Sequence, residues 1–125
     1  MTGLVYDTGA LIAAERDDRR FWLLHGRALA RGQAPVVPTP VLAETWRGRP
    51  AMARLLSGCL VEPLDAPQAR AAGLLLGSCA RTVGATDAVV VEAALRRGHA
   101  VVTSDRHDVE ALAAGVNRRV DVLVV

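Results

Sequence analysis

The chain has 125 residues, of which 51% are hydrophobic and 22% are charged, and its formal net charge is +2 at pH 7. This balance is typical of a globular protein and excludes a disordered one, and the length predicts a single domain over residues 1–125. The small net charge excludes a protein that holds nucleic acid through bulk positive charge.

Short apolar segments rich in β-branched residues predict five strands. Most of them lack strict alternation of polar and apolar residues, which is typical of parallel strands covered by helices on both faces. The predicted strands are residues 3–6, 35–37, 59–64, 100–103 and 120–125.

Helical segments lie between these strands, and they have start and stop signals at their ends. Thr39, Asp65 and Thr86 are predicted N-caps, and residues 48–52 form a loop marked by Gly and Pro inside an otherwise helical region. Strand alternating with helix along the whole chain predicts an α/β fold with a parallel sheet. The predicted helices are residues 18–31, 40–46, 66–80, 87–97 and 106–114.

The cysteines and the hydropathy of the chain indicate in which cellular compartment the protein is expected. Cys59 and Cys79 form no CxxC pair and have no His at ligand spacing, which favours reduced thiols over a zinc site. No apolar stretch approaches the length of a membrane span, and Asp7 interrupts any signal-peptide pattern. We therefore expect a soluble cytoplasmic protein that does not bind a membrane.

Acidic residues follow the strands in a recurring position. Asp7 and Asp105 end the first and fourth predicted strands, Glu44 lies about a turn into the helix after the second, and Asp87 opens a helix. Because the carboxyl ends of parallel strands share one edge, these carboxylates converge there if the first and fourth strands are neighbours. Each acid alone also fits a helix cap or a solvated helix surface.

Four carboxylates at one edge repel one another, and a divalent cation relieves that repulsion. Mg²⁺ prefers hard oxygen ligands, so the pattern favours a metal site. Thr103 or Ser104 is placed to hydrogen-bond a ligand or a metal-bound water. Asp108 either joins the site or stabilises the first turn of the helix that follows.

Four segments, in this order, carry a resemblance to a known family. VYDTGALIA, VLAETW, GATDAVVVEAALRRGHAVVTSD and RHDVEAL span nearly the full chain. Together they resemble PIN-domain proteins, and above all the VapC-type toxins of bacterial toxin–antitoxin pairs. The fold that the resemblance implies is a PIN-like three-layer sandwich, a central parallel sheet of about five short strands with helices on both faces.

The resemblance also implies an activity. It implies an endoribonuclease that depends on Mg²⁺ or Mn²⁺, cleaves cellular RNA, is neutralised by a cognate antitoxin protein and forms a homodimer. The family's acidic quartet, as catalytic residues and metal ligands, maps onto Asp7, Glu44, Asp87 and Asp105. The auxiliary candidates are Thr8, Thr103, Ser104 and Asp108.

One position departs from the family pattern. Members often carry Ser or Asn two residues after the first Asp, where this chain has Gly9. A polar contact at that position is therefore not expected here.

Two other interpretations stay open. The first is a PIN-like binding module with weak or no nuclease activity. The second is a receiver-like α/β signalling domain, which also places acids at strand ends, but its pattern includes a lysine and this chain has none. Ser104, His107 and Asp108 crowd together without the sharp turn that exposes a nucleophile, which argues against a catalytic triad.

Two further features point to binding surfaces. Phe21 and Trp22 are adjacent on one predicted helix and cannot both face the same core, so one of them is expected at the surface, where an antitoxin segment or a second copy could cover it. Arginines around the acids are candidates for contacts to flanking RNA phosphates, namely Arg47, Arg49, Arg96 and Arg106.

Overall fold

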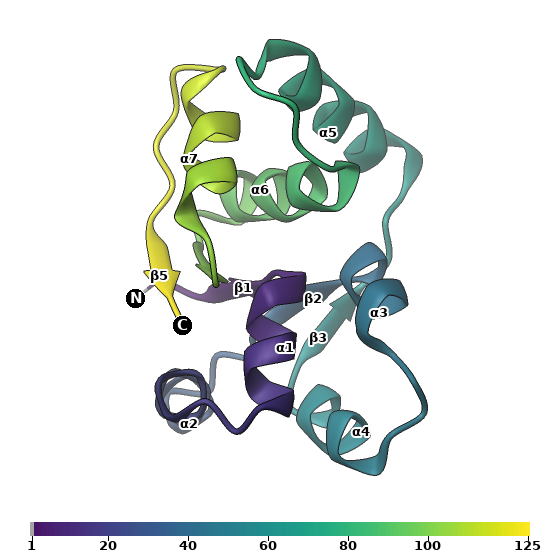
Figure 1. The fold of residues 1–125 in the computed structure, drawn as a ribbon, viewed down its shortest axis with the longest axis vertical. Coiled ribbons are helices and arrows are strands. Elements are labelled where there is room, and N and C mark those ends of the chain that lie inside the picture. Colours follow the sequence, from purple (N-terminus) through teal and green to yellow (C-terminus); the bar gives the residue numbers. More distant parts are fainter. Residues whose placement is uncertain (1) are drawn as a thin grey trace.

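The computed structural model describes residues 2–125 and shows a parallel sheet between two layers of helices (Figure 1). The sheet has five strands in the order β3-β2-β1-β4-β5. Every neighbouring pair is parallel, so the expected α/β sandwich with a parallel five-stranded sheet is confirmed. The strands are β1 (Leu4–Tyr6), β2 (Val36–Pro38), β3 (Leu60–Glu62), β4 (Ala100–Thr103) and β5 (Val122–Val124).

Seven helices lie within the described residues. In Figure 1, α5, α6 and α7 cover one face of the sheet, α1, α2 and α4 lie on the other, and α3 lies beside α1. None of these helices is long and apolar enough to cross a membrane. They are α1 (Thr8–Glu15), α2 (Arg19–Ala30), α3 (Thr39–Thr45), α4 (Pro50–Ser57), α5 (Ala66–Ser78), α6 (Ala85–Arg97) and α7 (Arg106–Ala114).

The core is built on the two central strands and on α6. Val5, Tyr6, Val101 and Val102 are fully buried, because helices cover β1 and β4 from both sides. In α6, residues 88–94 are all buried, since this helix packs against the sheet, α5 and α7 at once. This burial on several sides explains why the sequence of these elements shows no simple alternation.

Helix starts differ from the sequence prediction at two places. Thr39 is not an N-cap; Pro38 takes that position, and the Thr39 hydroxyl accepts a hydrogen bond from the Leu64 amide at 3.1 Å. Thr86 is not an N-cap either, because α6 begins at Ala85, two residues before the predicted start, and Gly84 is its N-cap. Asp65 is the N-cap of α5, as predicted.

The order of the strands fixes where the candidate site lies. From β1 the chain builds β2 and β3 on one side and then returns to place β4 and β5 on the other. The order therefore reverses between β1 and β4, the position at which open α/β sheets bind ligands outside the carboxyl ends of the strands. Asp7 follows β1 and Asp105 follows β4 at this position.

Candidate active site

Asp7 lies at the centre of the edge formed by the carboxyl ends of the strands. Its amide donates to the Val102 carbonyl of β4 at 3.2 Å, and its carboxylate accepts from the Ala10 amide at 2.8 Å as the N-cap of α1. Burial raises the pKa of Asp7 to about 6, and the nearby charge of Asp87 adds to the rise. Hydrogen bonds from the Thr103 hydroxyl and the Ala10 amide offset part of it. This carboxyl therefore titrates close to neutral pH.

Glu44 is held against α1 by a side-chain hydrogen bond. The Thr8 hydroxyl, at the first turn of α1, donates to Glu44 Oε1 at 2.6 Å. Since Thr8 directly follows Asp7, the bond brings the acid of α3 to the residue next to the central acid. Thr8 thus has a defined contact in the site.

Asp87, in the first turn of α6, shows that the acids converge. Burial is the largest cause that raises its pKa, and the negative charges of Asp108, Glu44 and Asp105 raise it further. These residues come from α3, α6, α7 and the end of β4, so the fold brings together acids that are far apart in the sequence. We call the five acids Asp7, Glu44, Asp87, Asp105 and Asp108 the acid edge.

Asp105 and Thr103 are linked to each other at the end of β4. The Asp105 amide donates to the Thr103 hydroxyl oxygen at 3.1 Å, and the Asp105 carboxylate accepts from the His107 amide at 2.9 Å as the N-cap of α7. The Thr103 hydroxyl also donates to the Asp105 carbonyl at 3.1 Å, and it lies close enough to Asp7 to lower the pKa of that carboxyl. Thr103, which is buried, therefore connects two of the acids.

Asp108 lies in the first turn of α7 and faces the other acids. Among the negative charges that raise the pKa of Asp87, that of Asp108 has a larger effect than those of Glu44 and Asp105. Its carboxylate also pairs with Arg81 at 3.2 Å. Asp105 is the N-cap of α7 and Asp108 lies in the first turn of that helix, and the charges of both raise the pKa of Asp87.

Ser104 occupies the space beside Gly9. A Cβ at position 9 would collide with the Ser104 Oγ and also approach its Cβ at 3.1 Å. Gly9 therefore allows α1 to approach the turn after β4, and a side chain there would displace Ser104. This contact gives a physical reason for the departure from the family pattern at this position.

The acid edge offers carboxylate oxygens, the type of donor that hard divalent cations prefer. Among residues 2–125, no group of three or more His, Cys, Asp or Glu side chains could hold a metal ion by itself. Mg²⁺ commonly takes one or two carboxylates and fills its other positions with water and substrate oxygens. Burial raises the pKa of Asp7 and the charge of Asp87 adds to the rise, so a cation beside these two carboxylates would relieve that repulsion.

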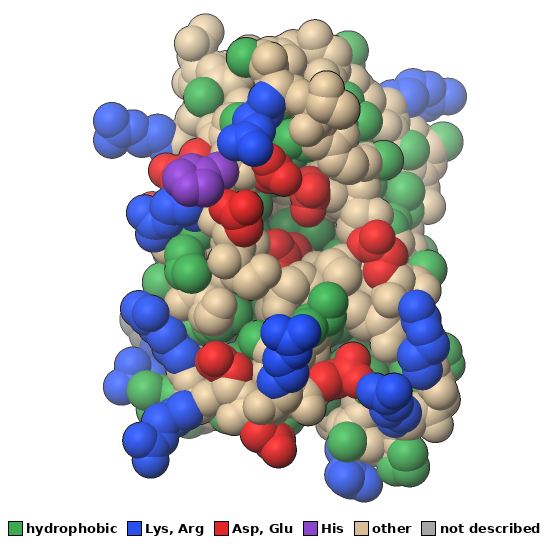
Figure 2. Space-filling model, viewed as in Figure 1, with side chains coloured by type: hydrophobic (Ala, Val, Ile, Leu, Met, Phe, Trp, Pro, Cys, Tyr) green, Lys and Arg blue, Asp and Glu red, His purple; other side chains and the backbone are tan. Residues whose placement is uncertain are grey.

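Charged side chains are distributed unevenly over the face that carries the acid edge. Figure 2 shows acidic side chains gathered around a hollow near the centre of this face, with basic side chains around it. Arg96, one of the arginines expected to contact RNA, is instead bound to Glu62 and Glu92. Sequence reasoning missed Arg81, because its contact with Asp108 joins two segments that no sequence pattern relates.

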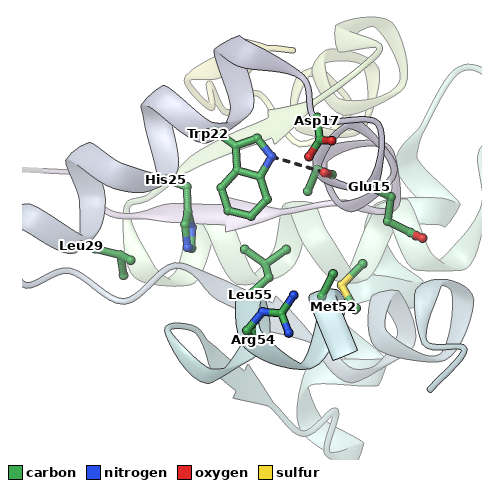
Figure 3. A pocket seen from close by; sticks show the side chains of 10 residues that line it. Glu15, Asp17, Trp22, His25, Leu29, Met52, Arg54 and Leu55 are labelled. Carbon is green, nitrogen blue, oxygen red and sulfur yellow. Dashed lines mark hydrogen bonds between the residues drawn. The ribbon is translucent and has the colours of Figure 1, made fainter. Parts of the chain in front are cut away.

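A separate apolar groove of about 550 Å³ lies between α2 and α4 (Figure 3). Phe21 is fully buried, whereas Trp22 is 40% exposed and lines the groove, with its indole nitrogen donating to the Ala14 carbonyl at 3.3 Å. One of the two aromatic residues therefore lies in the core and the other at the surface. His25 also lines the groove, and burial lowers its pKa, so it is neutral at pH 7.

Comparison with known proteins supports the fold. No family model and no curated protein matches the sequence. The chain is similar in structure to a chain in the crystal structure of VapBC2 from Rickettsia felis bound to a DNA fragment from their promoter, with a TM-score of 0.74, 14% identity and 98% of each chain covered.

A second similar structure is a toxin–antitoxin complex from Klebsiella pneumoniae. Its TM-score is 0.64 at 15% identity, and the likeness covers 85% of this chain and 89% of that chain. At these identities the likeness supports the fold class alone, a three-layer α/β sandwich with a central parallel sheet.

Proposed function

We propose that this chain is the toxin of a toxin–antitoxin pair and that it acts as an endoribonuclease dependent on Mg²⁺ or Mn²⁺. The observation that carries the proposal is the placement of acids from separate segments at one edge of the sheet, where burial, and then the charge of neighbouring acids, raises the pKa of Asp7 and Asp87. Perturbed carboxylates at the switch point of a parallel sheet are typical of functional sites. The likeness to structures of toxin–antitoxin complexes supports the same proposal.

The metal in this proposal would be held by Asp7 and Asp87, with Glu44 and Asp105 or Asp108 around them. When bound, a divalent cation polarises a phosphoryl oxygen and lowers the pKa of a coordinated water. Asp7, whose pKa burial raises to about 6 in the metal-free protein, would release its proton when a cation binds, so metal binding should be weaker at acid pH.

The hydroxyls of the site position these carboxylates. Thr8 fixes one oxygen of Glu44, and Thr103 lies between Asp7 and Asp105. Because hydroxyls carry no charge, they orient the acids without neutralising them. The acid edge therefore keeps the negative charge that a cation requires.

The test of the nuclease is cleavage of a mixed RNA pool with Mg²⁺, with Mn²⁺ and with EDTA. We expect cutting with either metal and none with EDTA, and Asp7→Asn should abolish it while the chain stays folded. Cutting that continues in EDTA, or that survives Asp7→Asn, would contradict the metal-dependent mechanism. A folded chain that cuts no RNA at all would favour the binding module, which is consistent with the absence of a closed cage of acids in residues 2–125.

The apolar groove is the surface that we assign to the antitoxin. Its lining of Trp22, Leu29, Met52 and Leu55 is suited to the apolar side of a helical segment, and its mouth is open to solvent. A second copy of the chain, as in the expected homodimer, is the other occupant that this surface allows.

Two tryptophans of similar exposure give a matched test of the groove. Trp22 lies in it and is 40% exposed, whereas Trp46 is 42% exposed and lies outside it. When the chain is co-expressed with the product of the reading frame immediately upstream, as the candidate antitoxin, Trp22→Ala should reduce pull-down and growth rescue, and Trp46→Ala should not. Equal effects of the two variants would contradict this assignment.

A further inference from the structure

Arg81 is distinguished from the other arginines by its partner. Among residues 2–125, it is the arginine that forms an ion pair with a member of the acid edge. The other paired arginines bind glutamates elsewhere, such as Glu62 and Glu110. The guanidinium of Arg81 is therefore held directly beside the acid edge.

The contact that holds Arg81 is weak and leaves most of its donors available. Arg81 lies in the loop between α5 and α6, and its side chain is 53% exposed. One terminal nitrogen lies 3.2 Å from Asp108 Oδ1, while a guanidinium has five N–H donors. Because a half-exposed ion pair contributes little to stability, an anion that accepts more hydrogen bonds from Arg81, such as a phosphate, can displace Asp108.

The acid edge creates a need for such a cation. Asp87 already experiences the negative charges of Asp108, Glu44 and Asp105, and RNA brings a further negative charge with every phosphate. A phosphodiester that approaches these acids is repelled unless a positive group meets it. Arg81 pairs with Asp108, and the charge of Asp108 in turn acts on Asp87. The planar guanidinium of Arg81 can bind two phosphate oxygens at once.

We propose that Arg81 is a phosphate-binding residue that exchanges Asp108 for a phosphate of the RNA strand next to the bond that is cut. The inference rests on the proposed ribonuclease function and adds a residue that positions the substrate. In the free protein, Asp108 keeps Arg81 at the edge, and in the complex the phosphate takes its place.

Two substitutions break the same ion pair but have opposite expected effects on RNA. Arg81→Gln removes the cation and should weaken binding of a labelled single-stranded RNA in EDTA by about tenfold. Asp108→Asn frees Arg81 and removes a negative charge, so binding should stay equal or become tighter. The slope of log affinity against log salt should fall by about 0.7 in Arg81→Gln, as expected for one lost phosphate contact on a single strand.

The controls separate charge from position. Arg31→Gln removes the same charge from an exposed residue just before β2, toward the amino ends of the strands, and should leave binding unchanged. Arg81→Lys keeps the charge without the bidentate geometry and should bind with intermediate affinity. In cleavage with Mg²⁺, Arg81→Gln should raise KM with little change in kcat.

The outcomes distinguish this inference from the proposed function. If Arg81→Gln and Asp108→Asn weaken RNA binding equally, Arg81 serves only to hold α7, and the inference is wrong while the nuclease stands. The same holds if wild type cuts RNA but Arg81→Gln binds it as well as Arg31→Gln does. A wild-type chain that neither binds nor cuts RNA would overturn both.

Discussion

Two clusters of acids in this molecule each contain a buried carboxylate, and they differ in the presence of counter-charge. Glu62 is 9% exposed and Asp7 is 6% exposed, so burial opposes ionisation of both. At Glu62, hydrogen bonds and charge from Arg96 and Arg97 outweigh burial and lower the pKa. No cation among residues 2–125 lowers the pKa of Asp7, which burial raises to about 6.

The difference shows how an ion-pair network can be told from a functional site. Arg96 donates to both oxygens of Glu62, at 3.1 and 2.8 Å, and also binds Glu92, so this cluster is satisfied within the fold. The acid edge holds five acids, and the arginine beside it pairs with one of them, Asp108. Its unbalanced charge is a cost to folding that a ligand can relieve.

The largest expected effect contrasts one acid from each group. Asp87→Asn should lower RNA cleavage by at least about 100-fold while the free energy of unfolding is kept or raised, because a repelling charge is lost. Glu62→Gln should keep cleavage but reduce the free energy of unfolding by about 2 kcal/mol, because Arg96 and Arg97 lose a hydrogen-bonded carboxylate. Cleavage assays and urea unfolding of both variants measure this. Loss of activity in Glu62→Gln at a temperature where it is fully folded would break the distinction.

The pH dependence of stability should differ in sign between the two groups. Between its ordinary pKa of 3.8 and about 6, folded Asp7 keeps a proton that the unfolded chain has released, so the free energy of unfolding falls as pH rises through this window. Glu62 has a lowered pKa, so its contribution is present above its ordinary value of 4.5 and is lost as pH falls below it.

Substitution of each acid should remove only that acid's contribution to the change of the free energy of unfolding with pH. Asp7→Asn should abolish its part of the decline above pH 4 and stabilise the protein at pH 7 by at most about 3 kcal/mol. Glu62→Gln should instead flatten the loss on the acid side. Urea unfolding at pH 3.5 to 7.5 tests this, and identical profiles for the two variants would show that burial alone governs both acids.

A smaller effect is expected from metal. If Mg²⁺ binds the acid edge, ten times its dissociation constant should stabilise the folded state by about 1.4 kcal/mol, a shift of a few degrees in Tm. Glu62→Gln should keep the full shift and the double variant Asp7→Asn, Asp87→Asn should lose it. Thermal melts with Mg²⁺, with Mn²⁺ and with EDTA provide the measurement. A shift that the double variant retains would locate the ion elsewhere.

The sequence predicted the sheet and the location of the acids because both depend on local patterns. Unalternated β-branched runs indicated buried parallel strands, and Asp7 and Asp105 directly follow two of them. The rule that carboxyl ends share an edge then brought them together once β1 and β4 proved to be neighbours. Five strands were therefore predicted within a few residues of their observed bounds.

The parts that sequence could not predict depend on contacts between distant segments. α1 was not recognised, because Ala10, Leu11 and Ala14 are buried and its apolar sequence continues that of β1 without a visible helical period. The capping rule selected Thr39, but the hydroxyl of Thr39 binds Leu64 across the fold. The same applies to the pairs Thr8–Glu44 and Arg81–Asp108, which tertiary structure alone creates.

The smallest expected effect tests whether the acid edge is also held by steric fit. Gly9 lies in the first turn of α1, where alanine would ordinarily favour the helix by up to about 1 kcal/mol. Here a Cβ would collide with the Ser104 Oγ, so Gly9→Ala should not give that gain and should instead lower the free energy of unfolding by about 1 kcal/mol.

Removal of the Ser104 side chain should reverse the sign. In a Ser104→Gly background the collision disappears, so Gly9→Ala should become neutral or stabilising, and a double-mutant cycle should give a coupling of at least about 1 kcal/mol. Cleavage should fall in Gly9→Ala and recover in part in the double variant, because the collision moves α1, and with it Asp7, away from the turn that carries Asp105. Additive effects would mean that Ser104 rotates aside freely, and the approach of α1 to β4 would then depend on the Asp7–Val102 backbone hydrogen bond rather than on the absence of a side chain at position 9.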